Sequence, residues 1–70
     1  MVKKVNSILT SAGVTFKIVT DDAQIYFETD TDFMPKQVLS QLMQISEFNA
    51  VSILDEYSCF LTLEFKKEVI

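Results

Sequence analysis

The sequence predicts a single α+β domain over residues 1–70, a two-layer sandwich with two helices on one face of a four-stranded antiparallel sheet. Two segments carry apolar residues at helical spacing, and four carry the alternation or β-branched runs of strands. The segments follow one another in the order helix, strand, strand, helix, strand, strand. Each half of the chain is therefore a helix followed by a hairpin.

The first half begins with an amphipathic helix of about three turns. The only glycine of the chain, Gly13, stands where this helix should stop, because glycine readily adopts the left-handed conformation of a C-terminal cap. A β-branched run at 15–20 and an alternating run at 23–29 predict two strands. The polar pair at 21–22 predicts the turn between them.

The second half repeats this order. Pro35 fits the first position of a second helix, where its missing N–H costs nothing, and Phe33 would pack on the helix as a hydrophobic staple. The helical pattern continues to residue 46. Strands are expected at 48–54 and 57–66, with a turn at 55–56 between them.

This order matches a ferredoxin-like βαββαβ fold whose first strand has been moved to the end of the chain. In such a circularly permuted sheet the second and fourth strands are central and the first and third are edges. The apolar content of the strands agrees, because Ile25–Phe27 and Phe60–Leu63 are the richest segments. The alternative is a different arrangement of two αββ units, completed by a second chain across a sheet edge.

One face of each strand should pack against the helices. Cys59 falls in that register and is interpreted as a small buried apolar residue. The sheet residues expected on the covered face are Phe16, Ile18, Ile25, Phe27, Val51, Ile53, Leu61, Leu63 and Phe65.

The chain has no His, Arg or Trp and a single Cys, which argues against catalysis and leaves no motif for a cofactor or metal. Nearly half of the residues (49%) are hydrophobic and the mean hydropathy is +0.24, so we expect apolar surface left over for self-association or another protein. The net charge of −4 disfavours nucleic acid and favours a basic partner. No apolar run is long enough for a membrane span, and a cytoplasmic location is expected.

The uncovered face of the sheet is the first candidate binding surface. Aromatic residues on the two central strands would lie close together if those strands pair, as they do in RNA-recognition domains. Basic residues and glycines do not surround them here, so protein contact is the favoured interpretation and base stacking the alternative. The residues expected on this surface are Tyr26, Phe60, Val19 and Thr62.

The second candidate surface is acidic. In the permuted topology the loop after the second strand and the turn between the last two strands share one end of the sheet. Asp30, Asp32, Asp55 and Glu56 would gather there and dock on a basic protein surface. The spacing of Glu28, Asp30 and Asp32 lacks the glycine and distal glutamate of a calcium loop, so a divalent-cation site is only weakly indicated.

The sequence therefore predicts a small acidic protein-interaction module and not an enzyme. It would act on a basic protein or on its own copy, in the manner of a stoichiometric inhibitor or an adaptor. Size and charge resemble those of the compact inhibitors that phages direct against host enzymes. The second hypothesis is a single-stranded nucleic-acid binder, and the third is a small metal-binding or enzymatic domain.

Overall fold

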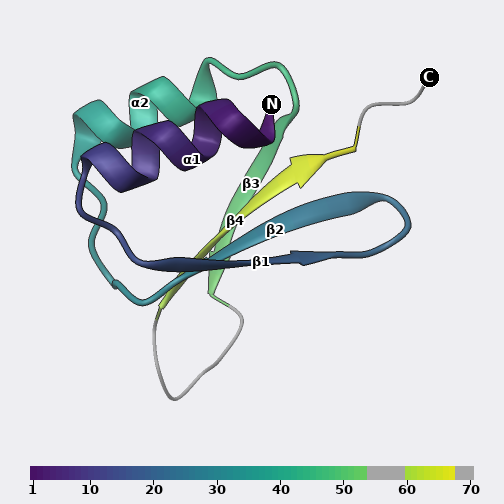
Figure 1. Cartoon of the computed structure of the whole chain (residues 1–70), viewed down its shortest axis with the longest axis horizontal. Coiled ribbons are helices and arrows are strands. Elements are labelled where there is room, and N and C mark those ends of the chain that lie inside the picture. Colours follow the sequence, from purple (N-terminus) through teal and green to yellow (C-terminus); the bar gives the residue numbers. More distant parts are fainter. Residues whose placement is uncertain (54–59, 68–70) are drawn as a thin grey trace.

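The computed structural model describes residues 1–53 and 60–67. Two helices lie side by side on one face of a single antiparallel sheet, which confirms the α+β sandwich (Figure 1). The elements are α1 (Val2–Ser11), β1 (Phe16–Thr20), β2 (Gln24–Thr29), α2 (Lys36–Met43), β3 (Phe48–Ile53) and β4 (Leu61–Lys66).

Helix α1 ends where the glycine predicted it would. Gly13 has a φ of 74°, and its N–H donates to the Thr10 carbonyl over 3.1 Å. The Val14 N–H donates to the Leu9 carbonyl over 3.0 Å, which completes a Schellman motif. Val14 packs against the core that contains Leu9, so the stop of the helix and the direction of the following strand are fixed together.

Helix α2 begins one residue later than predicted. Pro35 is the N-cap, with extended backbone angles, and its carbonyl accepts a hydrogen bond from the Leu39 N–H at 3.0 Å. This shift makes Met34, and not Phe33, the residue that precedes the cap. Met34 packs on the core, whereas Phe33 is 69% exposed, so the predicted staple by Phe33 is wrong.

The strand order β1-β2-β4-β3 places β2 and β4 in the centre and β1 and β3 at the edges, as the sequence predicted. Tyr26 of β2 faces Val19 of β1 on one side and Glu64 of β4 on the other. The β3–β4 pairing is interrupted by a register shift between Phe48 and Ala50. The two edge strands therefore differ in regularity, since β1 pairs with β2 without a shift.

The core lies between the helices and the two central strands. Phe27 packs against Phe16 with ring centroids 5.6 Å apart and against the edge of Phe65 at 5.5 Å. Phe48 makes a similar T-shaped contact with Phe65 at 5.6 Å. The buried apolar residues are Val5, Leu9, Phe27, Leu42, Ile45, Leu63 and Phe65.

The helices cover less of the sheet than the sequence suggested. Ile18 is 43% exposed, Ile53 is 56% exposed and Val51 is 37% exposed, although all of them lie on the helix side of their strands. They belong to the edge strands, whereas the fully buried sheet residues belong to the central strands. A layer of two short helices shields the middle of the sheet and leaves apolar side chains at both margins.

The predicted fourth strand starts too early. Strand β4 begins at Leu61, and Phe60 precedes it. Residue 54 and residues 55–59, including the predicted turn and Cys59, lie outside the described residues. Among the residues that are described, no helix has the length and apolar character needed to cross a bilayer.

Candidate functional site

The outer edge of β1 is the first feature of the candidate site. The Asp21 N–H donates to the Gln24 carbonyl over 3.0 Å, and the Asp30 N–H donates to the Thr15 carbonyl over 3.1 Å. In an antiparallel ladder such hydrogen-bonded residues alternate with residues whose backbone groups point the other way. The odd-numbered residues of β1 therefore bind β2. The backbone N–H and C=O groups that point away from the sheet are those of Phe16, Ile18 and Thr20.

Apolar side chains flank this backbone on both faces. Ile18 lies on the helix side and is 43% exposed, and Val19 lies on the opposite side and is 38% exposed. Lys17, the only charged residue of the strand, has its Nζ 3.7 Å from the Glu28 carboxylate on β2. The edge thus combines hydrogen-bonding backbone with accessible apolar surface.

The outer edge of β3 is built differently. The Lys66 N–H donates to the Glu47 carbonyl over 2.7 Å, so the even-numbered residues of β4 bind β3. Val51 and Ile53 consequently direct their backbone groups outward. The register shift between Phe48 and Ala50 shortens the regular part of this edge and increases its twist, which discourages pairing with another strand.

The turn between β1 and β2 is organised by one carboxylate. Asp21 Oδ1 accepts hydrogen bonds from the backbone N–H groups of Ala23 at 2.8 Å and Gln24 at 2.7 Å. The Tyr26 hydroxyl donates to Asp21 Oδ2 at 2.9 Å. The amide hydrogen bonds, from Ala23 first, and then the tyrosine hold the pKa of Asp21 below its ordinary value, and the same carboxylate raises the pKa of Tyr26. A negative charge is thereby fixed at the end of β1.

The face of the sheet away from the helices does not bring the predicted aromatic pair together. Tyr26 faces Glu64, whereas Phe60 lies four residues before Glu64 and outside β4. Val19 does lie beside Tyr26, directly across from it. Thr62 is only 3% exposed, because it is a short side chain in a central strand with neighbours on both sides, so it offers little surface to a partner.

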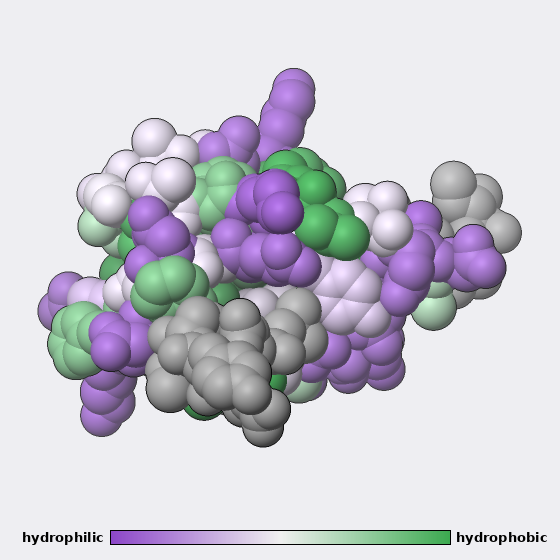
Figure 2. Space-filling model, turned by 90° about the horizontal axis from the view of Figure 1, so that it is seen from below, coloured by the Kyte–Doolittle hydropathy of each residue, from purple (hydrophilic) through white to green (hydrophobic). Residues whose placement is uncertain are grey.

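The surface seen from below is largely hydrophilic and is interrupted by small apolar patches (Figure 2). The paired rows of this face explain that appearance. Lys17 and Glu28 form one row with Thr62, and Tyr26 and Glu64 form the next. Charged and hydroxyl groups therefore lie beside Val19 and Tyr26, and within residues 1–53 and 60–67 the paired rows of this face do not place two aromatic side chains next to each other, as base stacking requires.

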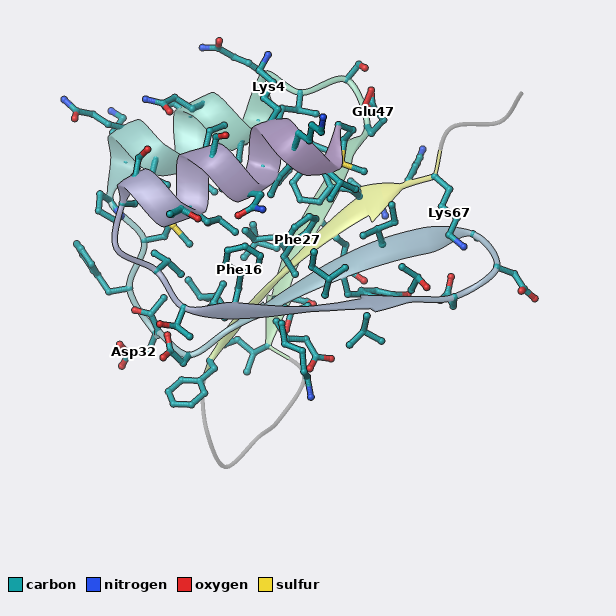
Figure 3. The ribbon with its side chains drawn as sticks, in the orientation of Figure 1. Lys4, Phe16, Phe27, Asp32, Glu47 and Lys67 are labelled. Carbon is teal, nitrogen blue, oxygen red and sulfur yellow. The ribbon has the colours of Figure 1, made fainter. Side chains whose placement is uncertain are left out.

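The predicted acidic cluster is only partly described. Asp30 and Asp32 are exposed, and Figure 3 shows Asp32 at the far end of the sheet, away from the core phenylalanines. Asp55 and Glu56 lie outside the described residues. Within residues 1–53 and 60–67 no group of three or more carboxylate, thiol or imidazole side chains can hold a metal ion. Glu28 is directed instead to Lys17, so the Glu28, Asp30 and Asp32 spacing does not produce a shared site.

A shallow hollow lies between the start of α1, the start of β2 and the residue that follows β4. Its described lining consists of Met1, Val2, Lys3, Ile25 and Lys67. Figure 3 shows Lys67 at this end of the sheet, directly after β4. The hollow offers two ammonium groups beside apolar side chains.

No protein-family model, no curated protein and no solved structure matches this chain. In the candidate site, sequence reasoning assigned Ile18 to the correct face of the sheet but misjudged its burial, since Ile18 lies on the helix side and is 43% exposed. The available signal was the combination of a β-branched run with an edge position, which together predict an exposed apolar margin.

Proposed function

We propose that this chain is a protein-interaction module that binds a partner by strand addition along the outer edge of β1. The observation that carries the proposal is the regular five-residue edge on which Phe16, Ile18 and Thr20 direct their backbone groups outward. Such a module works by stoichiometric binding, as an inhibitor or an adaptor does.

Strand addition obtains affinity from main-chain hydrogen bonds and specificity from the alternating side chains beside them. Ile18 and Val19 supply apolar contacts on the two faces of the added strand, and both are more than a third exposed. The net charge of −4 favours a partner strand with basic flanks.

The strand order also supports a proposal about the fold itself. The order β1-β2-β4-β3 is the order that a ferredoxin-like sheet acquires when its first strand moves to the end of the chain. We infer a circular permutation of that fold on this basis. The cytoplasmic location expected from the sequence stays a prediction.

A displayed library of extended peptides tests the proposal. Peptides selected on the wild-type protein are measured against Ile18→Pro, which removes an outward N–H and places a ring in the path of an added strand. Val51→Pro is the matched control, because it makes the same change on the outer edge of β3. We expect peptides that bind the wild type and Val51→Pro but not Ile18→Pro. Selected peptides that bind all of these proteins equally would refute the proposal.

A further inference from the structure

We propose that the strand added to β1 is β1 of a second copy of this chain, paired antiparallel around a two-fold axis at Val19. This inference rests on the proposed function and names its partner. The two sheets would then join into one continuous sheet across the dimer.

Both copies present the same outward-directed backbone groups. Ile18 and Thr20 direct their N–H and C=O groups away from β2. When Val19 faces its counterpart, Ile18 of one copy lies opposite Thr20 of the other. These residues then exchange both N–H···O bonds of a hydrogen-bonded pair, once on each side of the axis.

The charges along the edge of β1 are complementary when two copies pair antiparallel. On the face away from the helices, Lys17 and Val19 of β1 are followed by Asp21, whose carboxylate accepts the hydrogen bond from the Tyr26 hydroxyl on the same face. Antiparallel pairing around Val19 sets Lys17 of each copy opposite Asp21 of the other. Opposite charges at such positions stabilise a sheet, and non-hydrogen-bonded pairs bring side chains closest. The edge is therefore complementary to itself.

The neighbouring registers are less favourable. Pairing around Lys17 places two ammonium groups directly opposite each other, which destabilises a sheet. Pairing around Ile18 places Lys17 opposite Val19 and leaves the Asp21 charge without a cation across the interface. Of these three registers, only the one around Val19 places Lys17 opposite Asp21 and also places the apolar Val19 opposite its own counterpart.

Exposed apolar side chains also favour this pairing. Ile18 and Val19 are exposed by 43% and 38%, and both lie at the centre of the joined edge. Burial of this apolar surface would stabilise the dimer in addition to the backbone hydrogen bonds between the two β1 strands. A five-residue strand pair is small for a dimer interface, so the association should be weak, with a Kd between about 10 µM and 1 mM.

Sedimentation equilibrium over that concentration range tests the inference. We expect the wild type and Val51→Pro to dimerise, and Ile18→Pro to raise the Kd at least about tenfold while keeping the wild-type circular dichroism spectrum. Lys17→Glu sets like charges opposite each other and provides a second variant without a backbone change. We expect it to raise the Kd about threefold or more, and the effect to shrink in high salt.

Oxidative cross-linking identifies the register. In a Cys59→Ser background, Val19→Cys should form a disulfide-linked dimer with oxidised glutathione, because two-fold-related cysteines there lie within disulfide distance. Ile18→Cys is the control for the register centred one residue earlier and should cross-link more slowly. Faster cross-linking of Ile18→Cys would overturn the Val19 register.

A wild type that stays monomeric at 1 mM, or an Ile18→Pro variant that dimerises as the wild type does, overturns the inference. The peptide selection separates this failure from that of the proposed function. If β1-dependent peptides bind a strictly monomeric protein, the edge recognises another chain and only the second copy is excluded. If no such peptide binds and the protein is monomeric, both proposals fail.

Discussion

The two edges of the sheet are alike in position and different in construction. Both expose apolar side chains on the helix side, Ile18 on β1 and Ile53 on β3. Strand β1 pairs with its neighbour residue by residue, whereas β3 carries a register shift after Phe48. An exposed isoleucine alone therefore does not define a binding edge. Strand addition also requires regular backbone beside the isoleucine, because only a regular edge can align a series of hydrogen bonds with another strand.

The largest expected effect comes from truncating a side chain in the core on which the sheet packs. Phe27 is fully buried and contacts the rings of Phe16 and Phe65. Phe27→Ala should lower the free energy of unfolding by about 3–5 kcal/mol, which is enough to unfold a domain of this size. Urea denaturation measures this change. Phe33→Ala is the control, since Phe33 is 69% exposed, and an equal loss there would contradict the assigned core.

The next test compares a β1 residue whose backbone N–H binds β2 with a β1 residue whose N–H points outward. Val19→Pro removes an N–H that binds β2 and should cost about 3 kcal/mol or more in stability. Ile18→Pro removes an outward N–H and should cost less than about 1 kcal/mol. The comparison uses thermal and urea unfolding at a concentration where the protein is monomeric. Equal losses would show that the alternation assigned to the edge is wrong.

A smaller effect concerns the charge at the end of β1. Hydrogen bonds from the Ala23 and Gln24 amides and the Tyr26 hydroxyl lower the pKa of Asp21 below its ordinary value, so its contribution to stability is present above the unfolded pKa and is lost as the pH falls through the folded pKa. Asp21→Asn keeps a side-chain acceptor for the turn and removes the charge. We expect its melting temperature to lie below that of the wild type at pH 7, and the difference to vanish in acid. A difference that is the same at pH 3 and pH 7 would contradict this assignment.

The smallest effect concerns Tyr26, whose hydroxyl donates a hydrogen bond to the Asp21 carboxylate. The Asp21 carboxylate raises the pKa of Tyr26 above its ordinary value, so the protonated hydroxyl stabilises the fold below the unfolded pKa and this contribution disappears as the pH rises through the folded pKa. Ultraviolet titration of the phenol should show Tyr26 ionising later in the wild type than in Asp21→Asn. Tyr26→Phe identifies its signal. Coincident titrations would argue against the hydrogen bond.

Local chemistry made much of the fold predictable. Gly13 stops α1 by a backbone conformation that few other residues adopt, and alternation placed Phe27 and Leu63 in the core. The central position of β2 and β4 followed from their apolar content. These features leave a signal in the composition or spacing of a single segment.

Features that depend on the relation between distant segments were not predictable. The register of β2 on β4 sets Tyr26 opposite Glu64, and no local pattern reveals that Phe60 is displaced from it. The width of the helix layer decides whether Ile18 is covered, and this is a property of the assembled sandwich. Helix α2 begins one residue later than the sequence predicted, so Met34 packs on the core in place of Phe33. Of the candidate site, the sequence indicated Val19 but not the direction of the β1 backbone.

Hydrogen exchange of the edge amides tests the central claim most directly. Exchange rates of the Ile18 and Thr20 amides are compared with those of Val51 and Ile53 in dilute and in concentrated solution. We predict that the β1 amides exchange rapidly in dilute protein and become protected at high concentration, while the β3 amides do not change. Concentration-dependent protection at Val51 and Ile53, with none at Ile18 and Thr20, would contradict the assignment of β1 as the binding edge.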